Sequence, residues 1–314
     1  MLCVIGFLLL FLGGELLVRG SVALAIRMKI STLVVGMTVV SFATSSPEIF
    51  VSVNALYQGS SNIIFGNVIG SNIANLALVL GLTALIFNVR ISDLTIKVNY
   101  PVLIFSSILL GFVLWFFNGI PQFFGYIFLS GIIIFSYFLI KRSRNNHSVR
   151  EEADFITGTK NFSLFKIILF LFLGVLALKY GADKLVEGTI LIAKLWGISE
   201  RIIAVSLVAI GTSVPELATS LIAAFKKEDS LAVGNLIGSN IFNILVVLGI
   251  TSALHSVKID DNAILYIDYV LMLFVTLLLA FFIYFGSKKS ISRKEGFFLL
   301  ISYILYMYVT ISFM

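Results

Sequence analysis

Charged residues are scarce in this chain of 314 residues. Asp, Glu, Lys and Arg make up 12% of it and hydrophobic residues 59%, whereas a soluble domain has about 25% charged residues. This composition leaves too little polar surface to cover a water-soluble globule. Apolar runs of roughly 20 residues recur along the chain, and each is long enough to cross the ~30 Å hydrocarbon core of a bilayer. The sequence therefore predicts an all-α polytopic membrane protein with the lipid bilayer as its surroundings.

Cysteine and histidine are almost absent. The single cysteine, Cys3, excludes an internal disulfide and a thiolate metal cluster. The two histidines, His147 and His255, fall in predicted loops. An intramembrane metalloprotease or lipid transferase would need a histidine metal motif or a catalytic dyad inside a span, so we expect a protein that is not an enzyme and has no cofactor. The net charge of +6 is attributed to basic cytoplasmic loops, and no nucleic-acid partner is expected.

The apolar runs predict ten membrane spans, in two groups of five. The only long polar stretch, Lys141–Ser163, separates the groups. We therefore expect a first repeat at 1–140, a loop at 141–163 and a second repeat at 164–314. The predicted spans are 3–25, 32–57, 62–87, 99–117, 121–140, 164–192, 200–225, 231–254, 265–285 and 296–313.

Basic residues are distributed unevenly between the two sides of these spans. Of the 22 Lys and Arg residues, the loops after the odd-numbered spans hold sixteen, and the opposite loops hold Lys194, Arg201 and Lys258. Cytoplasmic loops carry an excess of Lys and Arg, so we expect a multi-pass protein of the plasma or inner membrane, with the central loop cytoplasmic and both termini outside. No basic residue precedes Arg19, so the first run is expected to be a retained span and not a signal peptide.

The two groups of spans repeat one pattern at a constant offset of 168 residues. ThrSer-x-ProGlu occurs at 44–48 and again at 212–216, and GlyAsn-x-IleGlySerAsnIle-x-Asn occurs at 66–75 and 234–243. Because each half has an odd number of spans, the second half enters the membrane from the opposite side. This arrangement is an inverted-topology repeat, which is common in secondary transporters.

The second and seventh predicted spans each hold a proline followed by a glutamate, Pro47–Glu48 and Pro215–Glu216. Proline removes a backbone donor and frees carbonyls in the preceding turn. A carboxylate at the centre of a span costs at least ~2.5–3.5 kcal/mol, so two of them at equivalent positions need a reason. A buried ion pair is disfavoured, because no basic residue lies near the middle of the second, third, seventh or eighth predicted span. The pattern favours a cation site.

Hydroxyl and amide side chains surround these motifs, one helical turn from each glutamate or on the following span. Alone, Ser and Thr are as readily explained by helix packing, but their duplication beside a duplicated glutamate favours a ligand role. An all-oxygen set suits Ca²⁺, Na⁺ or Mg²⁺ and does not suit zinc or copper. The residues are Thr44, Ser45, Ser71 and Asn75 in the first repeat and Thr212, Ser213, Ser239 and Asn243 in the second.

These paired motifs resemble the α-repeats of the calcium/cation antiporter superfamily, and most closely those of the prokaryotic sodium/calcium exchangers. The resemblance covers essentially the whole chain. It implies ten helices in two inverted five-helix repeats, with helices 2, 3, 7 and 8 broken or kinked around a central cation site and helices 1 and 6 sliding across that core. The implied ligands are Ser41 (carbonyl), Thr44, Ser45, Glu48, Ser71, Asn75, Ala209 (carbonyl), Thr212, Ser213, Glu216, Ser239 and Asn243.

Two departures from the family pattern matter. The usual Gly-Thr-Ser is Ala43-Thr44-Ser45 in the first repeat, and we expect the alanine to stiffen the break there. Many relatives carry Asp where this chain has Asn243. An asparagine keeps an oxygen ligand but removes a third negative charge, and no potassium dependence is expected.

The resemblance implies a secondary active antiporter that exports Ca²⁺ in exchange for Na⁺, and we expect a monomer. Three Na⁺ per Ca²⁺ with net charge movement is the stoichiometry that gives useful export. Ca²⁺/H⁺ antiport on the same fold stays open, because Glu48 or Glu216 could also carry protons. A passive channel is disfavoured, because inverted repeats with broken helices favour alternating access.

Overall fold

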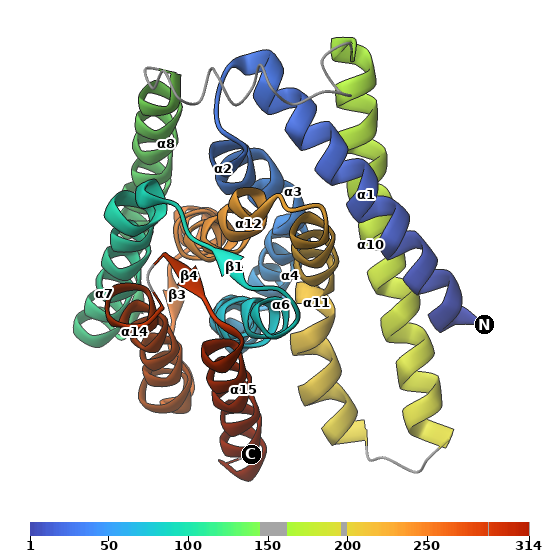
Figure 1. Ribbon diagram of the computed structural model, residues 1–314. Helices are drawn as coiled ribbons and strands as arrows, with labels where there is room; N and C mark the ends of the chain where they lie inside the picture. Colours follow the sequence, from blue (N-terminus) through green and yellow to red (C-terminus); the bar gives the residue numbers. More distant parts are fainter. Residues whose placement is uncertain (145–161, 196–199, 288, 314) are drawn as a thin grey trace. The chain divides into compact units, whose positions relative to one another are not determined.

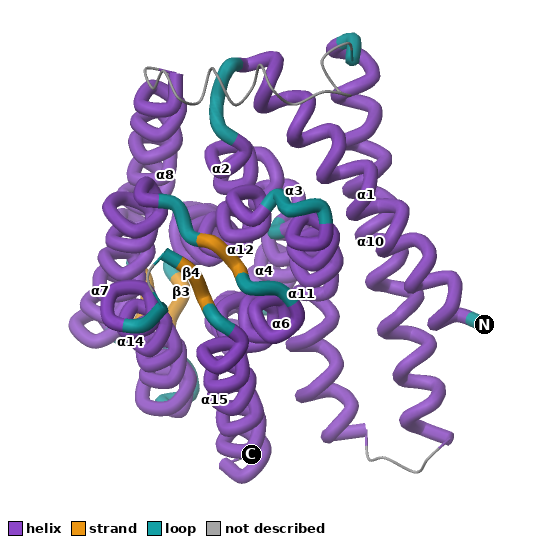
Figure 2. Tube along the Cα trace, viewed as in Figure 1, coloured by secondary structure: helices purple, strands orange, loops and turns teal. Residues whose placement is uncertain are grey.

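The computed structural model describes residues 1–144, 162–195, 200–287 and 289–313, which are helical over most of their length (Figure 2). Within these residues, seven helices are long and apolar enough to cross a membrane, and the broken pair Thr32–Thr44 and Ser46–Tyr57 would be an eighth. A polytopic helical membrane protein is therefore confirmed, while ten spans and the inverted repeat stay predictions. The seven are Leu2–Met28, Ser61–Ile86, Thr95–Phe117, Gln122–Arg144, Leu164–Ile192, Asp229–Leu254 and Ile264–Phe285.

The described chain forms two compact units, and each draws on both predicted halves. The first unit comprises Met1–Thr44 and Ser136–Asn235. Most of the predicted loop at 141–163 lies outside the described residues. The elements of this unit are α1 (Leu2–Met28), α2 (Thr32–Val35), the π-helix η1 (Gly36–Val40), α3 (Ser41–Thr44), the end of α8 (Gln122–Arg144), α10 (Leu164–Leu195), α11 (Glu200–Phe225) and the start of α12 (Asp229–Phe242).

The second unit comprises Ser45–Phe135 and Leu236–Met314. Besides most of α8 and the end of α12, it contains α4 (Ser46–Tyr57), α5 (Ser61–Ile73), η2 (Ala74–Val79), α6 (Leu80–Ile86), β1 (Val89–Arg90), η3 (Thr95–Asn99), α7 (Tyr100–Phe117), β2 (Gly119–Ile120), η4 (Asn243–Val247), α13 (Leu248–Leu254), β3 (Val257–Lys258), η5 (Ile264–Tyr269), α14 (Val270–Phe285), β4 (Ser290–Ile291) and α15 (Arg293–Phe313).

Helices α1 and α10 of the first unit lie side by side with their backbones in close contact (Figure 1). Glycines every seven residues make this approach possible. A Cβ added to Gly13 would lie 2.7 Å from the Leu178 nitrogen, and one added to Gly181 would lie 2.8 Å from the Leu10 nitrogen. Small residues let helix backbones approach in membranes, where the hydrophobic effect between helices is lost. The glycines are Gly6, Gly13 and Gly20 on α1 and, at the repeat offset of 168, Gly174, Gly181 and Gly188 on α10.

Single π-helical turns interrupt the long helices of the second unit at matching places in the two repeats. Segment η2 begins at Ala74, beside Asn75, and η4 begins at Asn243, its mate at the repeat offset. Such turns widen the helix by one residue and are frequent at functional sites. The prediction that the third and eighth spans are locally distorted therefore agrees with the backbone.

Short strands occur in the connectors of the second unit, and the all-helical fold class holds. Strands β1 and β4 pair antiparallel, and so do β2 and β3, each with two residues per strand. Gly119 has φ +147°, and a Cβ there would lie 2.4 Å from the Val257 carbonyl oxygen. The backbone groups of short connectors need partners, and this close pairing supplies them. Hydrophobic periodicity carries no sign of strands so short.

Candidate functional site

The predicted ligands are divided between the two units. The second unit holds Ser45, Glu48, Ser71, Asn75, Ser239 and Asn243, and the first holds Ser41, Thr44, Ala209, Thr212, Ser213 and Glu216. Ala209 lies on α11, but its side chain falls outside the described part of that helix. All the others are buried, with exposures of 2% or less, except Thr212, which is partly exposed.

Glu48 lies in the first turn of α4, behind a break in the backbone. Ser45 leaves the regular helix with φ −86° and ψ 6°, and Pro47 occupies one of the first two positions of the new helix. Proline is favoured there because the N–H it lacks would have no intrahelical partner. An acid in the first turn is stabilised by the positive end of the helix dipole. The break therefore gives the fully buried Glu48 favourable electrostatics that a mid-helix position would not provide.

Two polar side chains of α5 hold the segment around Glu48. The Ser71 hydroxyl donates to Glu48 Oε1 at 3.5 Å. Asn67 Nδ2 lies 3.0 Å from the Glu48 carbonyl oxygen and 2.9 Å from the Ser52 hydroxyl, and it donates to both. The amide of Asn67 therefore connects α5 to the first two turns of α4, and it fixes the backbone of Glu48 while leaving the carboxylate to other groups.

The first unit contains a related arrangement around Asn235. Its Nδ2 donates to the Ser220 hydroxyl at 3.4 Å, and its Oδ1 accepts from Thr44 Oγ1 at 3.2 Å. The Ser41 hydroxyl lies 2.9 Å from the Asn235 carbonyl oxygen and 2.8 Å from that of Gly36. The predicted ligands Ser41 and Thr44 are therefore brought together by one asparagine.

Asn67 and Asn235, with their partners Ser52 and Ser220, are residues that the sequence reasoning missed. Both pairs keep the offset of 168 residues. Ser52 lies one turn after Glu48 and Ser220 one turn after Glu216, and both serines are fully buried. A sequence signal could have identified them. A serine follows each glutamate by one turn, and it is duplicated together with the asparagine of each GlyAsn pair.

Glu216 is fully buried on α11, but its surroundings differ from those of Glu48. Helix α11 runs without interruption from Glu200 to Phe225, with Pro215 inside it. The Thr219 hydroxyl donates to the Pro215 carbonyl oxygen at 2.8 Å. The seventh span, which was predicted to be broken or kinked, is therefore a continuous helix with a proline inside it. The interruption lies in the repeat that carries Ala43 and not in the one that carries Gly211, and the expected stiffening by Ala43 stays a prediction.

Several predicted ligands have oxygens that no protein group engages. Among the described residues, the hydroxyls of Ser45 and Ser213, both amide atoms of Asn75 and Oδ1 of Asn243 have no hydrogen-bond partner, although each is buried. A buried polar group without a partner costs roughly 1–3 kcal/mol. Oxygens held this way can coordinate a hard cation. Within the described residues no group of three or more His, Cys, Asp or Glu side chains gathers.

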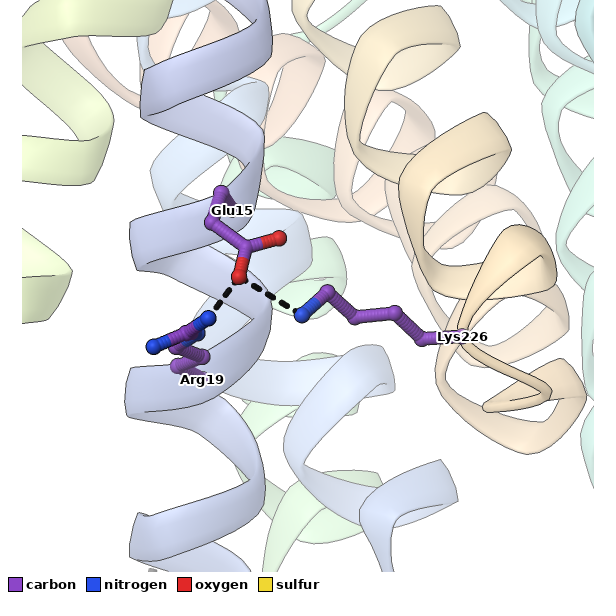
Figure 3. Close-up of polar contacts among 3 residues, drawn as sticks. All are labelled: Glu15, Arg19 and Lys226. Carbon is purple, nitrogen blue, oxygen red and sulfur yellow. Dashed lines mark hydrogen bonds and ion pairs between the residues drawn. The ribbon is translucent and has the colours of Figure 1, made fainter.

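A second acidic group lies outside the predicted ligand set, on α1. Glu15 Oε1 accepts from Arg19 Nε and, at 2.7 Å, from Lys226 Nζ just beyond the end of α11 (Figure 3). The side chains of Glu15 and Lys226 are 20% and 28% exposed. This ion-pair cluster connects α1 to α11, and it accounts for the charge of Glu15 without a transported ion.

Comparisons with known proteins agree with this arrangement. The sequence profile of the sodium/calcium exchanger protein family matches residues 1–141 and 166–312. The putative antiporter CaxA of Alkalimonas amylolytica is 36% identical, over 98% of this chain and 97% of its own. The sodium/calcium exchanger MaX1 of Methanosarcina acetivorans is 30% identical, over 97% of this chain and 98% of its own.

Solved structures are also similar to this chain over nearly its whole length. One structure of the sodium-calcium exchanger NCX_Mj, soaked with Na⁺ and Ca²⁺, superimposes with a TM-score of 0.80 at 31% identity, over 97% of this chain and 96% of that one. The profile match over most of the chain and the end-to-end similarity of these relatives, together with the buried glutamates and repeated motifs, lead to one conclusion: the chain belongs to the sodium/calcium exchanger family, whose members are multi-pass membrane transporters with these ions as substrates.

Proposed function

We propose that this chain is a secondary active antiporter that exports one Ca²⁺ in exchange for three Na⁺, with net movement of charge, by alternating access. The observation that carries the proposal is the pair Glu48 and Glu216. Both are fully buried, they stand at the same place in two copies of one motif, and both lie in helices of an apolar, multi-pass chain. Burial of two carboxylates is costly unless cations compensate them.

The charge and chemistry of the ligands favour these ions. Two carboxylates balance one Ca²⁺ and can be shared by several Na⁺. The remaining proposed ligands are hydroxyl, amide and carbonyl oxygens, which hard cations prefer. We assign them to Thr44, Ser45, Ser71, Asn75, Thr212, Ser213, Ser239, Asn243 and the carbonyls of Ser41 and Ala209.

The stoichiometry follows from the energy that each ion supplies. With a potential of 100 mV, negative inside, and a tenfold Na⁺ gradient, each entering Na⁺ provides ~1.4 kcal/mol from concentration and ~2.3 kcal/mol from voltage. Moving Ca²⁺ outward costs ~4.6 kcal/mol against this voltage. Three Na⁺ leave ~6.5 kcal/mol, enough for a Ca²⁺ ratio above ~10⁴, whereas two leave ~2.8 kcal/mol, enough for only about a hundredfold.

The topology belongs to the same proposal. Helices α11 and α15, added to the eight spans that length and composition support, make ten, five in each inverted repeat. The excess of Lys and Arg after odd-numbered spans supports cytoplasmic placement of 141–163 and external termini, in the plasma or inner membrane. The glycine-lined contact of α1 with α10 supports the idea that these two helices move as a pair during alternating access.

Uptake of ⁴⁵Ca²⁺ into proteoliposomes tests this function. Vesicles are loaded with Na⁺, K⁺ or choline, pH is equal on both sides, and valinomycin with K⁺ sets the membrane potential in a matched series. We expect uptake only with internal Na⁺, faster when the interior is made positive, because each cycle carries one net positive charge out of the vesicle with three Na⁺ leaving against one Ca²⁺ entering. A rate of ⁴⁵Ca²⁺ uptake that does not depend on the membrane potential would contradict the stoichiometry of three Na⁺ per Ca²⁺.

The same vesicles separate the rival coupling ion. Uptake driven by an imposed pH gradient without Na⁺ would move the assignment to Ca²⁺/H⁺ antiport, and the site would stand unchanged. Ca²⁺ currents that need no counter-ion would instead indicate a channel. Light-scattering measurement of the mass of the detergent-solubilised chain tests the proposed monomer.

A further inference from the structure

The amide of Asn243, a proposed ligand, can bind a cation in only one of its two orientations. A carboxylate presents two equivalent oxygens, but an amide presents an oxygen at one end and an NH₂ donor at the other. An asparagine therefore binds a cation in only one of its two orientations, and the other orientation places a donor against the ion. Asn243 is fully buried, so water cannot correct a wrong orientation. A protein neighbour that accepts a hydrogen bond from the NH₂ end would favour the orientation that binds a cation.

Asn72 is the residue that engages Asn243. Within the second unit, Asn243 Nδ2 donates to Asn72 Oδ1 at 3.1 Å. Asn243 Oδ1 has no hydrogen-bond partner among the described residues. Asn72 thus occupies the donor end of Asn243 and leaves its oxygen unengaged. Asn72 is itself an amide, however, and it could present either end.

Met272 on α14 removes that ambiguity. Asn72 Nδ2 donates to Met272 Sδ at 3.6 Å. A thioether sulfur can accept a weak hydrogen bond but cannot donate one, so the NH₂ of Asn72 faces the sulfur and its oxygen faces Asn243. If Asn72 were flipped, its oxygen would face the sulfur and its NH₂ would require the oxygen of Asn243. Both Asn72 and Met272 are buried, with exposures of 2% and 1%.

The equivalent pair of the other repeat lacks this device. Asn240 and Asn75 stand at the repeat offset from Asn72 and Asn243 and lie in the same unit. Both are fully buried, and neither amide has a hydrogen-bond partner among the described residues. Within the described residues, hydrogen bonds therefore fix the orientation of Asn243 but not that of Asn75.

We propose that Met272 and Asn72 are positioning residues that act in series to hold Asn243 with its oxygen available as a Ca²⁺ ligand. The inference rests on the proposed function, since it takes Asn243 as a ligand. It assigns a role in ion binding to a methionine that carries no suitable ligand atom for a hard cation, in a helix outside the repeated motifs.

The test is a double-mutant cycle read out as the dissociation constant for Ca²⁺, measured by isothermal titration calorimetry on the purified full chain. The variants are Met272→Leu, Asn243→Asp and the two together. Met272→Leu keeps volume and burial, and such swaps are well tolerated. The matched control is Met37→Leu, since Met37 is buried to the same extent at 1% and lies in the other unit.

We expect Met272→Leu to weaken Ca²⁺ binding about two- to tenfold, the range of one net hydrogen bond, and Met37→Leu to leave it unchanged. In the Asn243→Asp background we expect no weakening from Met272→Leu, because a carboxylate presents an oxygen in either orientation. A purely structural role would produce the same loss in both backgrounds, and that result would overturn the proposal. So would wild-type affinity in Met272→Leu.

Na⁺-driven ⁴⁵Ca²⁺ uptake by the unchanged protein, run in parallel, keeps the two proposals apart. If the unchanged protein binds Ca²⁺ but Na⁺ does not drive uptake, the proposed function fails, and the binding cycle still decides the role of Met272. If uptake is driven by Na⁺ and the cycle shows no coupling, only the positioning role fails. An unchanged protein that binds no Ca²⁺ overturns both.

Discussion

The segments around Glu48 and Glu216 carry the same motif in two different backbones. Ahead of Glu48 the helix is broken at Ser45 and a new helix starts, so the glutamate stands in a first turn. Around Glu216 the helix is continuous and the proline lies inside it. Identical residues at identical spacing thus produce a helix N-terminus in one repeat and a helix interior in the other. The motif therefore determines which polar groups are present, but it does not by itself determine whether the helix is broken or continuous.

The hydrogen bonds of the two motif asparagines, Asn67 and Asn235, also differ between the repeats. Asn67 makes two hydrogen bonds of 2.9 and 3.0 Å with the α4 segment, one of them to the backbone of Glu48. Asn235 makes a longer bond of 3.4 Å to Ser220 and accepts from Thr44. The asparagine of the first motif therefore braces its glutamate, and that of the second holds the hydroxyl pair Ser41 and Thr44. Four sets of substitutions test how far the two repeats differ.

The largest effect is expected from the glutamates. Glu48→Gln and Glu216→Gln should each lower Na⁺-driven ⁴⁵Ca²⁺ uptake by about 100-fold or more, because each removes one of two buried charges in a medium of low dielectric constant. The isosteric change leaves packing intact, which thermal unfolding in detergent can verify. If one variant kept near-normal uptake, the two motifs would not be equivalent in ion binding, whatever their sequence similarity.

The next effect concerns the contact of α1 with α10. Gly13→Ala and Gly181→Ala each place a methyl group within 2.8 Å of a backbone nitrogen on the facing helix. Overpacking of this kind costs about 1–3 kcal/mol, and we expect equal losses at these two equivalent sites by thermal unfolding. Gly66→Ala is the control, because a Cβ there meets no atom within 4 Å. Unequal losses at the two sites would show that the repeats do not share this contact evenly.

An effect of similar size, but unequal between the two repeats, is expected from the asparagines. Asn67→Ala should destabilise the protein by about 1–3 kcal/mol, because it leaves the buried Ser52 hydroxyl and the Glu48 carbonyl without this donor. Asn235→Ala should cost less, because its bonds are longer. Differential scanning fluorimetry of both variants measures the order. The reverse order would contradict the bracing role of Asn67.

The smallest effect is expected at the ion-pair cluster of Figure 3. The first repeat carries Gln58 where the second has Lys226, so Lys226→Gln makes the two repeats alike at this point. Glu15 keeps Arg19 as a partner, and a partly exposed ion pair contributes less than about 1 kcal/mol. We expect a small loss of thermal stability that shrinks in 1 M salt. A large, salt-insensitive loss would mean that Lys226 contributes by packing.

Much of the site could be predicted from the sequence, because charge and repetition carry the information. Glu48 and Glu216 stand out as acids in apolar runs, and the offset of 168 residues brings the Ser, Thr and Asn positions with them. The break at Ser45 and the continuity of α11 could not be told apart, because both segments contain the same ThrSer-x-ProGlu motif. Met272 carries no signal at all, since a methionine in a span is ordinarily apolar filling.

The most direct test of the central claim is the number of ions that bind to the purified chain and compete there. Calorimetric titration of Ca²⁺ at increasing Na⁺ is predicted to give one Ca²⁺ per chain, displaced by Na⁺ with a Hill coefficient above one, and no binding in Glu48→Gln or Glu216→Gln. Ca²⁺ binding that persists in either variant, or that Na⁺ does not displace, would contradict a shared Na⁺/Ca²⁺ site that depends on both repeats.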